Sequence, residues 1–261
     1  MKNKPSRKVI FITGGSSGIG KATAMTFARA GVNVAICGRN EKDLDQVRKE
    51  IGPDHEVLKL PVDVSDEEQV RAGIGQIIRH WGRLDFVFAN AGINGVWAPV
   101  EEISAQEWDQ TINVNLRGTF LTIKYCVPHL KKEGGVIVIT SSVNGTRMFS
   151  NTGSTAYAST KAALVALGKM LAVELAEHQI RVNIICPGWI ETEIEESTQK
   201  RNVAQFEHRV EFHEGVVPLT HGKPGTPQEI ADLVLFLCSA GARHITGTEI
   251  WIDGAQSLLQ G

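Results

Sequence analysis

Tyr157 and Lys161 are the residues of this sequence whose types and spacing most directly indicate chemistry. They stand four positions apart in the stretch YASTK, which leads into the alanine-rich run AALVALGKMLAVEL. In a helix this spacing places both side chains on one face, where their polar ends can act together. A free tyrosine has a pKa of about 10, and an adjacent ammonium group favours the phenolate and lowers that pKa. The pair predicts a proton donor with a tuned pKa, and the alternative is a surface pair on an amphipathic helix.

A glycine-rich turn, TGGSSGIG at residues 13–20, indicates a second chemical site. It follows the apolar run KVIFIT and leads directly into a helical pattern. Its glycines at positions 14, 18 and 20 allow a tight turn, close approach of the backbone to a phosphate, and close packing of helix on strand. This context predicts a pyrophosphate cradle at the first junction of strand and helix, with a purely structural turn as the alternative.

Both sites need a scaffold, and the rest of the chain predicts one. Short runs rich in β-branched residues alternate with longer helical patterns from one end of the chain to the other. The runs are KVIFIT, NVAIC, EVLKL, LDFVFA, GVIVIT, IRVNIIC and EIWID. Such alternation is typical of βαβ units and of a parallel sheet with helices on both faces. Since no linker or repeat interrupts the series, we predict a single α/β domain over residues 1–261.

Residues 189–226 differ from the rest because they are highly charged and contain no clear strand. A stretch of this length outside the sheet is typical of a lid or binding element, so we predict a variable substrate lid there. The lid contains several histidines and acids without a recognised ligand spacing, so no metal site is predicted. These residues are His208, Glu211, His213, Glu214 and His221.

Composition excludes several other classes of function. The 27 Lys and Arg residues nearly balance the 29 Asp and Glu residues, so no overall field favours nucleic acid or an anionic membrane. No segment approaches the roughly 18 apolar residues of a membrane span. The cysteines are widely spaced within apolar segments, as expected for reduced, buried thiols of a cytoplasmic protein. They are Cys37, Cys126, Cys186 and Cys238.

Four motifs together resemble the short-chain dehydrogenase/reductase family in order and spacing. They are TGGSSGIG, NAG at 90–92, YASTK, and the PG of NIICPGWIET, and the resemblance covers essentially the whole chain. It implies a doubly wound Rossmann-type sheet of seven strands in the order 3-2-1-4-5-6-7. It also implies an NAD(P)-dependent oxidoreductase that interconverts a carbonyl and a secondary alcohol. Members of the family commonly form tetramers, and the alanine-rich face of residues 162–172 would suit packing between subunits.

The resemblance assigns catalytic roles to four residues. Tyr157 is implied to be the general acid and base, and Lys161 to lower the tyrosine pKa and hold the nicotinamide ribose. Ser142 is implied to bind and polarise the substrate oxygen, so that Ser142 and Tyr157 together contact the substrate. Asn115, in the stretch NVNLRG, is implied to hold a water that links Lys161 to solvent.

Two of these assignments have competitors in the sequence. The spacing of fifteen positions between Ser142 and Tyr157 is longer than the family's usual pattern, so Ser141 is the alternative substrate serine. Asn113 competes with Asn115, and a helix-interior asparagine with a structural hydrogen bond is a further alternative. Either serine could also simply end the strand GVIVIT.

The resemblance also implies a set of cofactor-binding residues. Asp63 would meet the adenine amino group, with helix capping as the alternative. Asn90 would brace the backbone beside the cofactor, and the stretch from Pro187 to Thr192 would meet the nicotinamide carboxamide. The full set is Gly14, Ser16, Ser17, Gly18, Ile19, Gly20, Arg39, Asp63, Val64, Asn90, Ala91, Gly92, Tyr157, Lys161, Pro187, Gly188, Ile190 and Thr192.

The end of the second predicted strand favours NADP(H) over NAD(H). Enzymes of this fold that select NAD usually place an acid about 20 positions beyond the glycines, where it meets the ribose hydroxyls. Here the strand ends in AICGRN, with Gly38 and Arg39 at that point, and a guanidinium can grip a 2′-phosphate. NAD(H) stays open as the alternative, because Arg39 could stack on adenine and Glu41 could turn toward a ribose.

The substrate is not identified by the sequence. A sugar, a steroid-like ketone, an acyl-thioester β-ketone and a small diketone all fit. Four residues predicted on loops after strands could form an apolar wall, with core packing as the alternative. They are Trp97, Met148, Phe149 and Trp189. Other functions considered are a non-catalytic dinucleotide-binding sensor or scaffold and a halohydrin dehalogenase. The complete set of catalytic residues argues against the first, and the nucleotide glycines with Lys161 argue against the second.

Overall fold

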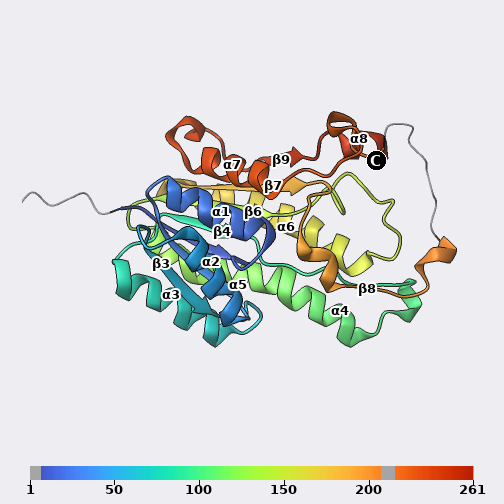
Figure 1. The fold of residues 1–261 in the computed structure, drawn as a ribbon, viewed down its shortest axis with the longest axis horizontal. Coiled ribbons are helices and arrows are strands. Elements are labelled where there is room, and N and C mark those ends of the chain that lie inside the picture. The colour runs from blue at the N-terminus through green and yellow to red at the C-terminus, as the bar shows by residue number, and fades with distance from the viewer. Residues whose placement is uncertain (1–6, 207–214, 261) are drawn as a thin grey trace, which may run out of the picture.

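A parallel sheet forms the centre of the computed structural model, which describes residues 7–206 and 215–260 (Figure 1). The strands of the sheet are β1 (Val9–Thr13), β2 (Asn33–Gly38), β3 (Val57–Pro61), β4 (Phe86–Ala89), β6 (Gly135–Thr140), β7 (Ile180–Pro187) and β9 (Glu249–Ile252). They lie in the order β3-β2-β1-β4-β6-β7-β9, and every pair is parallel. Counted along the chain within this sheet, the order is the predicted 3-2-1-4-5-6-7, so the predicted fold class is confirmed.

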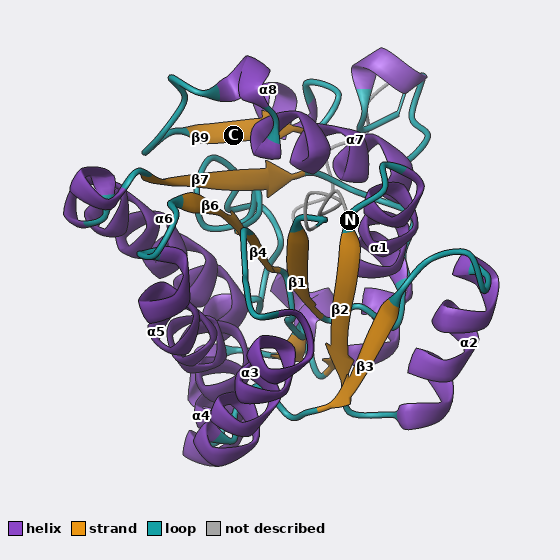
Figure 2. Cartoon of the chain, turned by 90° about the vertical axis from the view of Figure 1, so that its left-hand side faces the viewer, coloured by secondary structure: helices purple, strands orange, loops and turns teal. Residues whose placement is uncertain are grey.

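Helices cover both faces of the sheet (Figure 2). They are α1 (Gly18–Arg29), α2 (Glu41–Ile51), α3 (Glu67–Trp81), α4 (Ala105–Ile112), α5 (Gly118–Leu130), α6 (Thr155–Glu174), α7 (Pro227–Cys238) and the short α8 (Gln256–Gln260). Two apolar cores result, one shared by α3, α5 and α6 and the other by α1, α2 and α7. In β1 the alternation is direct, because Ile10 and Ile12 enter the second core while Phe11 enters the first.

Local sequence explains where several helices begin. Asn40 caps α2 by accepting a hydrogen bond from the backbone of Lys42. Asp66 caps α3 by accepting from the backbone of Gln69. At α7, Thr226 forms a reciprocal capping box, and Pro follows at the first helical position. These caps fix the strand-to-helix turns at the carboxyl ends of the strands.

A second, two-stranded sheet lies outside the central one and was not predicted. It pairs β5 (Gly95–Trp97) in parallel with β8 (Thr198–Lys200). The expectation that residues 189–226 contain no strand is therefore wrong at β8. The cause is that this strand is only three residues long and gains its partner from a distant loop, so no local periodicity marks it.

The order of strands reverses between β1 and β4, since the chain runs from β1 to β2 and β3 on one side and continues from β4 on the other. In open α/β sheets, ligands bind beyond the carboxyl ends of the strands at such a switch point. The loops that follow β1, β4, β6 and β7 therefore define where a site is expected.

The cysteines and the membrane prediction can be compared with the structure directly. All four thiols are free and buried, and burial raises the pKa of the Cys37 thiol to about 12. Such thiols are unreactive packing groups, as predicted. Within residues 7–206 and 215–260, no helix is both long and apolar enough to cross a bilayer.

Candidate active site

The glycine turn after β1 is built so that its backbone is uncovered. Gly14 and Gly18 have φ angles of +66° and +46°, which glycine adopts without strain. A Cβ at Gly20 would lie 2.0 Å from the carbonyl oxygen of Gly14, so α1 packs directly on the turn. Ser17 caps α1 without a side-chain hydrogen bond, which leaves the first helical N–H groups open toward the cleft. A cradle that any side chain would fill, at a helix N-terminus, fits a pyrophosphate.

Asn90 connects three strands beneath the cleft. Its backbone N–H and that of Ala91 both donate to Thr13 Oγ1 at 3.0 Å. Its side-chain Nδ2 donates to the Thr13 carbonyl at 3.3 Å, and its Oδ1 accepts from Thr140 Oγ1 at 3.2 Å. The Asn90 side chain thus links the ends of β1 and β6 at the start of the loop after β4. Thr13 and Thr140 were not singled out from the sequence, because a threonine at a strand end is common.

Tyr157 and Lys161 lie on α6 and both line the cleft. Tyr157 is 8% exposed and Lys161 is 3% exposed. Burial raises the pKa of Tyr157, and a hydrogen bond with Ser142 acts in the opposite direction. Burial lowers the pKa of the Lys161 ammonium to about 8.

The expected lowering of the Tyr157 pKa by Lys161 is wrong in this structure. The Lys161 Nζ donates to the Thr140 carbonyl at 2.9 Å and lies 5.4 Å from the centre of the tyrosine ring. Desolvation therefore has a larger effect on the phenol than the ammonium does. The phenol is held in its protonated form at neutral pH, ready to donate.

The two candidate serines have different partners. Ser141 Oγ donates to the Lys161 carbonyl at 2.7 Å, so its hydroxyl is used within the protein. Ser142 Oγ accepts from the backbone N–H of Asn144 at 3.1 Å and shares a hydrogen bond with Tyr157. This geometry favours Ser142 as the group that would meet a substrate oxygen.

Asn115 lies in a π-helical turn, Asn113–Arg117, between α4 and α5. Its Oδ1 accepts from the Ile93 N–H at 2.8 Å, and its Nδ2 donates to the Ile93 carbonyl at 2.9 Å. A Cβ on Gly92 would lie 3.3 Å from Asn115 Oδ1 and 3.6 Å from Lys161 Nζ, so both side chains meet at Gly92. Asn113 is exposed. The structure therefore favours Asn115 as the partner of the lysine.

The residues predicted for the adenosine end lie along the cleft beside the glycine turn. Asp63 and Val64 line it, and Asp63 Oδ1 accepts from the N–H and Oγ of Ser65 at 2.9 and 2.6 Å. Asp66, not Asp63, caps the following helix. Arg39 is exposed at the rim of the cleft. The side chain of Glu41 lies 3.7 Å from Lys59 Nζ.

The segment after β7 crosses the cleft to the glycine turn. Its N–H groups bond to the C-terminal region, with Gly188 N donating to the Ile252 carbonyl at 3.1 Å and Trp189 N to Gln256 Oε1 at 2.7 Å. A Cβ on Gly18 would lie 3.1 Å from the side chain of Thr192. The two motifs that are predicted to bind a cofactor therefore face each other across one cleft. Gln256 was not predicted, because nothing in its local sequence marks it.

A cleft of about 550 Å³ brings most of the predicted residues together. It is lined by Gly14, Ser16, Ser17, Gly18, Ile19, Arg39, Asp63, Val64, Asn90, Ala91, Gly92, Ser142, Tyr157, Lys161, Pro187, Gly188, Ile190 and Thr192. Gly20 and Asn115 are not among the residues that line the cleft. Of the predicted apolar residues, Trp97, Met148 and Trp189 line the cleft. Phe149 does not, because its side chain is 75% exposed to solvent.

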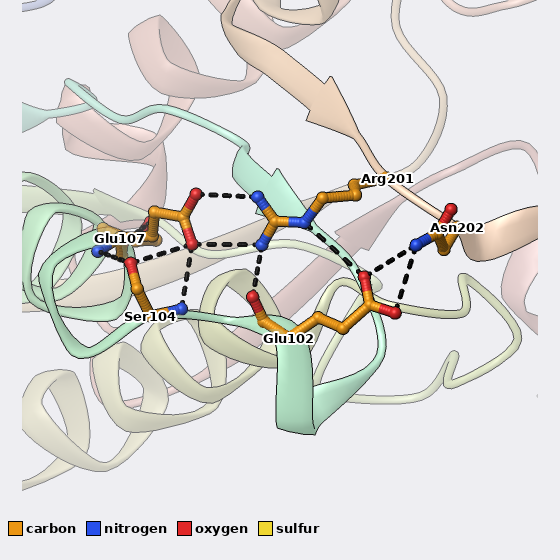
Figure 3. Close-up of polar contacts among 6 residues, drawn as sticks. Glu102, Ser104, Glu107, Arg201 and Asn202 are labelled. Carbon is orange, nitrogen blue, oxygen red and sulfur yellow. Dashed lines mark hydrogen bonds and ion pairs between the residues drawn. The ribbon is translucent and has the colours of Figure 1, made fainter.

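Ion pairs and hydrogen bonds fasten the strand β8 region to the start of α4 (Figure 3). The Arg201 guanidinium donates to both oxygens of Glu107 at 3.0 and 3.2 Å and to the Glu102 carbonyl. Glu107 also accepts from Ser104 in a capping box, and Asn202 Nδ2 donates to the Glu102 carboxylate. Arg201 holds the pKa of Glu107 down to about 2. The β8 region, inside the predicted lid, is therefore tethered to the start of α4.

The histidine-rich part of the predicted lid falls mainly outside the described residues. His208, Glu211, His213 and Glu214 belong to that part. Among the residues whose placement is described, no three His, Cys, Asp or Glu side chains are grouped as metal ligands would be.

Comparison with known proteins places this geometry among oxidoreductases. A family model described as Enoyl-(Acyl carrier protein) reductase matches residues 14–255. A 3-ketoacyl-ACP reductase from Sinorhizobium meliloti 1021 is 49% identical, with a TM-score of 0.92 over 96% of this chain and 99% of that one. A 3-ketoacyl-(acyl-carrier-protein) reductase from Brucella melitensis, complexed with NADH, is 30% identical, with a TM-score of 0.84 over 96% and 98% of the chains. Levodione reductase from Leifsonia aquatica is 36% identical over 96% of this chain and 94% of its own length.

Proposed function

This chain belongs to the short-chain dehydrogenase/reductase family, and from that premise we propose that it is an NAD(P)-dependent oxidoreductase interconverting a carbonyl and a secondary alcohol. The observation that carries the proposal is that Tyr157, Ser142 and Lys161 line the same cleft as the glycine turn. When bound, a nicotinamide cofactor supplies or accepts the hydride. The chain's own residues hold the two reactants and exchange one proton with the substrate oxygen.

Tyr157 is the proposed general acid and base. Because burial raises its pKa, the phenol is protonated at neutral pH and donates to the oxygen of a carbonyl undergoing reduction. Ser142 shares a hydrogen bond with the phenol and orients the same oxygen. Lys161 binds the nicotinamide ribose and, beside Asn115, resupplies the proton. The low-exposure setting of all four groups excludes bulk water from the reacting atoms.

The cofactor is held mainly by backbone groups. The open N-terminus of α1 and the glycines of residues 14–20 bind the pyrophosphate. Asp63 and Val64 bind the adenine, and the wall on the ribose side of the cleft is formed by Asn90, Ala91 and Gly92. Pro187, Gly188, Ile190 and Thr192 bind the nicotinamide carboxamide. The strand order supports this division, because Asp63 follows β3, the glycine turn follows β1 and Pro187 ends β7.

NADP(H) is the proposed preferred cofactor. Arg39 lies at the rim of the cleft just after β2, with its guanidinium in solvent and available for a phosphate. Glu41, the first acid after the strand, lies near Lys59 and begins α2, where the helix dipole also favours its charge. These contacts support a phosphate-binding role for this corner rather than an acid that binds ribose hydroxyls.

Self-association and a cytoplasmic location are part of the proposal. Exposed apolar side chains lie on the two neighbouring helices α5 and α6, with Phe120 48%, Met170 72% and Val173 81% exposed. Burying such a patch between copies supports a homo-oligomer, and the family's common assembly makes a tetramer the expected form. The free, buried thiols support residence in a reducing compartment.

The proposal is tested by a screen of carbonyls and alcohols with both nicotinamide cofactors, in which the absorbance of the reduced cofactor is followed. Turnover of at least one carbonyl or secondary alcohol is expected. Binding of a cofactor without turnover of any member of a broad panel would instead indicate a sensor or scaffold.

A further inference from the structure

Gln256 is a buried side chain at the substrate end of the cleft. It is 6% exposed, it lies at the start of α8, and it lines the same cleft as Ser142 and Tyr157. Its Oε1 accepts from the backbone N–H of Trp189 at 2.7 Å. A Cβ on Gly188 would lie 2.7 Å from the same oxygen, so the amide packs directly on the turn that follows β7.

The orientation of this amide is fixed by its contacts. The amide oxygen of Gln256 must face the Trp189 N–H, because the Nε2 group is itself a donor and cannot accept a hydrogen bond. The backbone that carries Gln256 is also held, since the Asp253 carboxylate accepts from the N–H groups of Ala255 and Ser257 at 3.1 and 2.9 Å. The Nε2 group is therefore held in one direction.

Among the residues that the structure describes, the Nε2 group of Gln256 has no hydrogen-bond acceptor, and it is not one of the fully buried unpartnered atoms, so it opens onto the cleft. Water or a ligand in the cleft is what can accept its hydrogen bond. Trp189 and Gly188, its immediate neighbours, line the same cleft. The donor therefore marks a position where a ligand oxygen would be recognised.

Other amides at the same end of the cleft have similar chemistry. Asn144 and Asn151 line it on the loop after β6, and Asn151 Nδ2 donates to Asn144 Oδ1 at 2.9 Å. That single bond uses one donor of Asn151 and one lone pair of Asn144, which leaves further donor and acceptor capacity on both. A cleft end with amides from two separate segments is suited to a substrate with more than one oxygen.

We propose that the substrate carries a second oxygen function, a hydroxyl or a keto group, and that Gln256 Nε2 donates a hydrogen bond to it. The proposal rests on the proposed oxidoreductase function. It makes Gln256 a residue that determines specificity, because a substrate without the second oxygen cannot accept the hydrogen bond of this donor. It favours hydroxy ketones, diketones and sugar-like compounds over ketones with a single oxygen.

The test uses three six-membered ring ketones that differ only in the second oxygen. They are cyclohexanone, the hydroxycyclohexanone with its hydroxyl on the neighbouring carbon, and the cyclohexanedione with carbonyls on opposite carbons. In the wild-type protein, kcat/KM for at least one compound with two oxygens should exceed that for cyclohexanone by about tenfold or more. The dione's two equivalent carbonyls account for only about a factor of two of this, by simple counting of reactive groups.

The variant Gln256→Leu should remove this preference. Gln256→Glu keeps an oxygen that can accept from the Trp189 N–H and lacks only the donor, so it should also remove the preference while leaving the affinity for NADPH unchanged in the absence of substrate. The matched control is Gln110→Leu, at an exposed glutamine of α4, which should keep the wild-type ratio. An unchanged ratio in Gln256→Leu overturns the assignment. So does a loss of cofactor affinity without substrate in Gln256→Glu, because the Nε2 donor would then serve the cofactor.

A binding measurement keeps the inference separate from the proposed function. Calorimetric titration of each compound into the protein saturated with NADP⁺, which cannot reduce a ketone, measures occupation of this end of the cleft without turnover. Tighter binding of a compound with two oxygens than of cyclohexanone, abolished in Gln256→Leu, supports the inference even if no compound is turned over. Equal binding of all three compounds overturns it, whatever the turnover.

Discussion

The glycine turn after β1 and the segment after β7 face each other across one cleft, yet they are held in different ways. The turn is shaped largely by contacts within residues 13–20, such as that of Gly20 with the Gly14 carbonyl, and by its four glycines. The segment after β7 is held by side chains from far along the chain, Gln256 on Trp189 and Glu107 on Arg201. The cofactor side should therefore tolerate almost no added atom. On the substrate side, substitution of a single side chain that holds the segment after β7 should change the substrate specificity.

Gly20→Ala is expected to have the largest effect, because it adds one atom to the rigid side. The new Cβ would lie 2.0 Å from the Gly14 carbonyl oxygen, which is backbone and cannot move aside cheaply. We expect loss of cofactor binding and a stability loss of about 1 to 3 kcal/mol. Urea unfolding and cofactor titration measure both effects.

Gly75→Ala in α3 is the control for that experiment. There the nearest atom is the flexible end of Arg79, at 3.2 Å. Alanine also favours a helix interior by about 1 kcal/mol over glycine. Normal cofactor affinity in Gly20→Ala would show that the turn is less rigid than its geometry indicates.

Tyr157→Phe should separate chemistry from binding. The ring still fills its buried position on α6, so folding and cofactor affinity should stay near wild type. Turnover should fall by at least about a hundredfold, as is typical for loss of a general acid or base. Tyr125→Phe, at the chain's other tyrosine, removes a hydroxyl that donates to Glu67 at 2.6 Å and should leave turnover unchanged. Near-normal turnover in Tyr157→Phe would refute the assigned role.

The same contrast explains how much could be predicted from the sequence. The strands, their order and the glycine turn were predictable because short-range patterns and a family resemblance both specify them. The Asn90 brace was predictable for the same reason, since NAG directly follows β4. These features depend on residues that are neighbours in the chain.

Features that depend on distant partners were missed or wrong. The pairing of β5 with β8 joins positions about a hundred residues apart, and Gln256 meets Trp189 across 67 positions. The pKa of Tyr157 depends on burial, which spacing alone does not reveal, so the helical Lys161 was given too large an effect. The π-helical turn at Asn115 has no simple local signature either.

The rates should depend on pH differently in the two directions. Burial raises the Tyr157 pKa, so below pH 9 most of the protein carries the neutral phenol, which reduction needs and oxidation does not. Alcohol oxidation should rise with pH between about 7 and 9, by up to about tenfold per unit, while carbonyl reduction should not rise. Initial rates in both directions, at saturating cofactor, measure this. A flat oxidation profile would show that the phenol does not accept the proton.

Arg39→Ala should affect one cofactor and spare the other. If the guanidinium binds the 2′-phosphate, the variant should lose about tenfold or more in kcat/KM with NADPH and change little with NADH. Arg48→Ala, at an exposed arginine of α2 outside the cleft, is the control. A native preference for NADH, or unchanged efficiency with NADPH in Arg39→Ala, would show that Arg39 does not bind the 2′-phosphate.

Arg201→Met should have the smallest effect, and it tests the tethered side most directly. The guanidinium joins the β8 region to Glu107 and Glu102, but solvent screens an ion pair at the surface, so stability should change little. We expect the KM for substrate to rise a few-fold while cofactor affinity stays constant, because the tether positions only the β8 region.

The pKa of Glu107 sets the range in which that comparison is valid. Its folded value is about 2, against an ordinary value of 4.5, so the ion pair's contribution is complete above about pH 4.5 and is lost as the pH falls toward 2. Measurements between pH 6 and 8 therefore compare an intact tether with none. Arg71→Met removes a similar exposed pair with Glu68 on α3 and should leave KM unchanged. If Arg201→Met weakened cofactor binding as much as substrate binding, the segment after β7 would affect both sites equally. The contrast between a rigid cofactor side and a tethered substrate side would then be wrong.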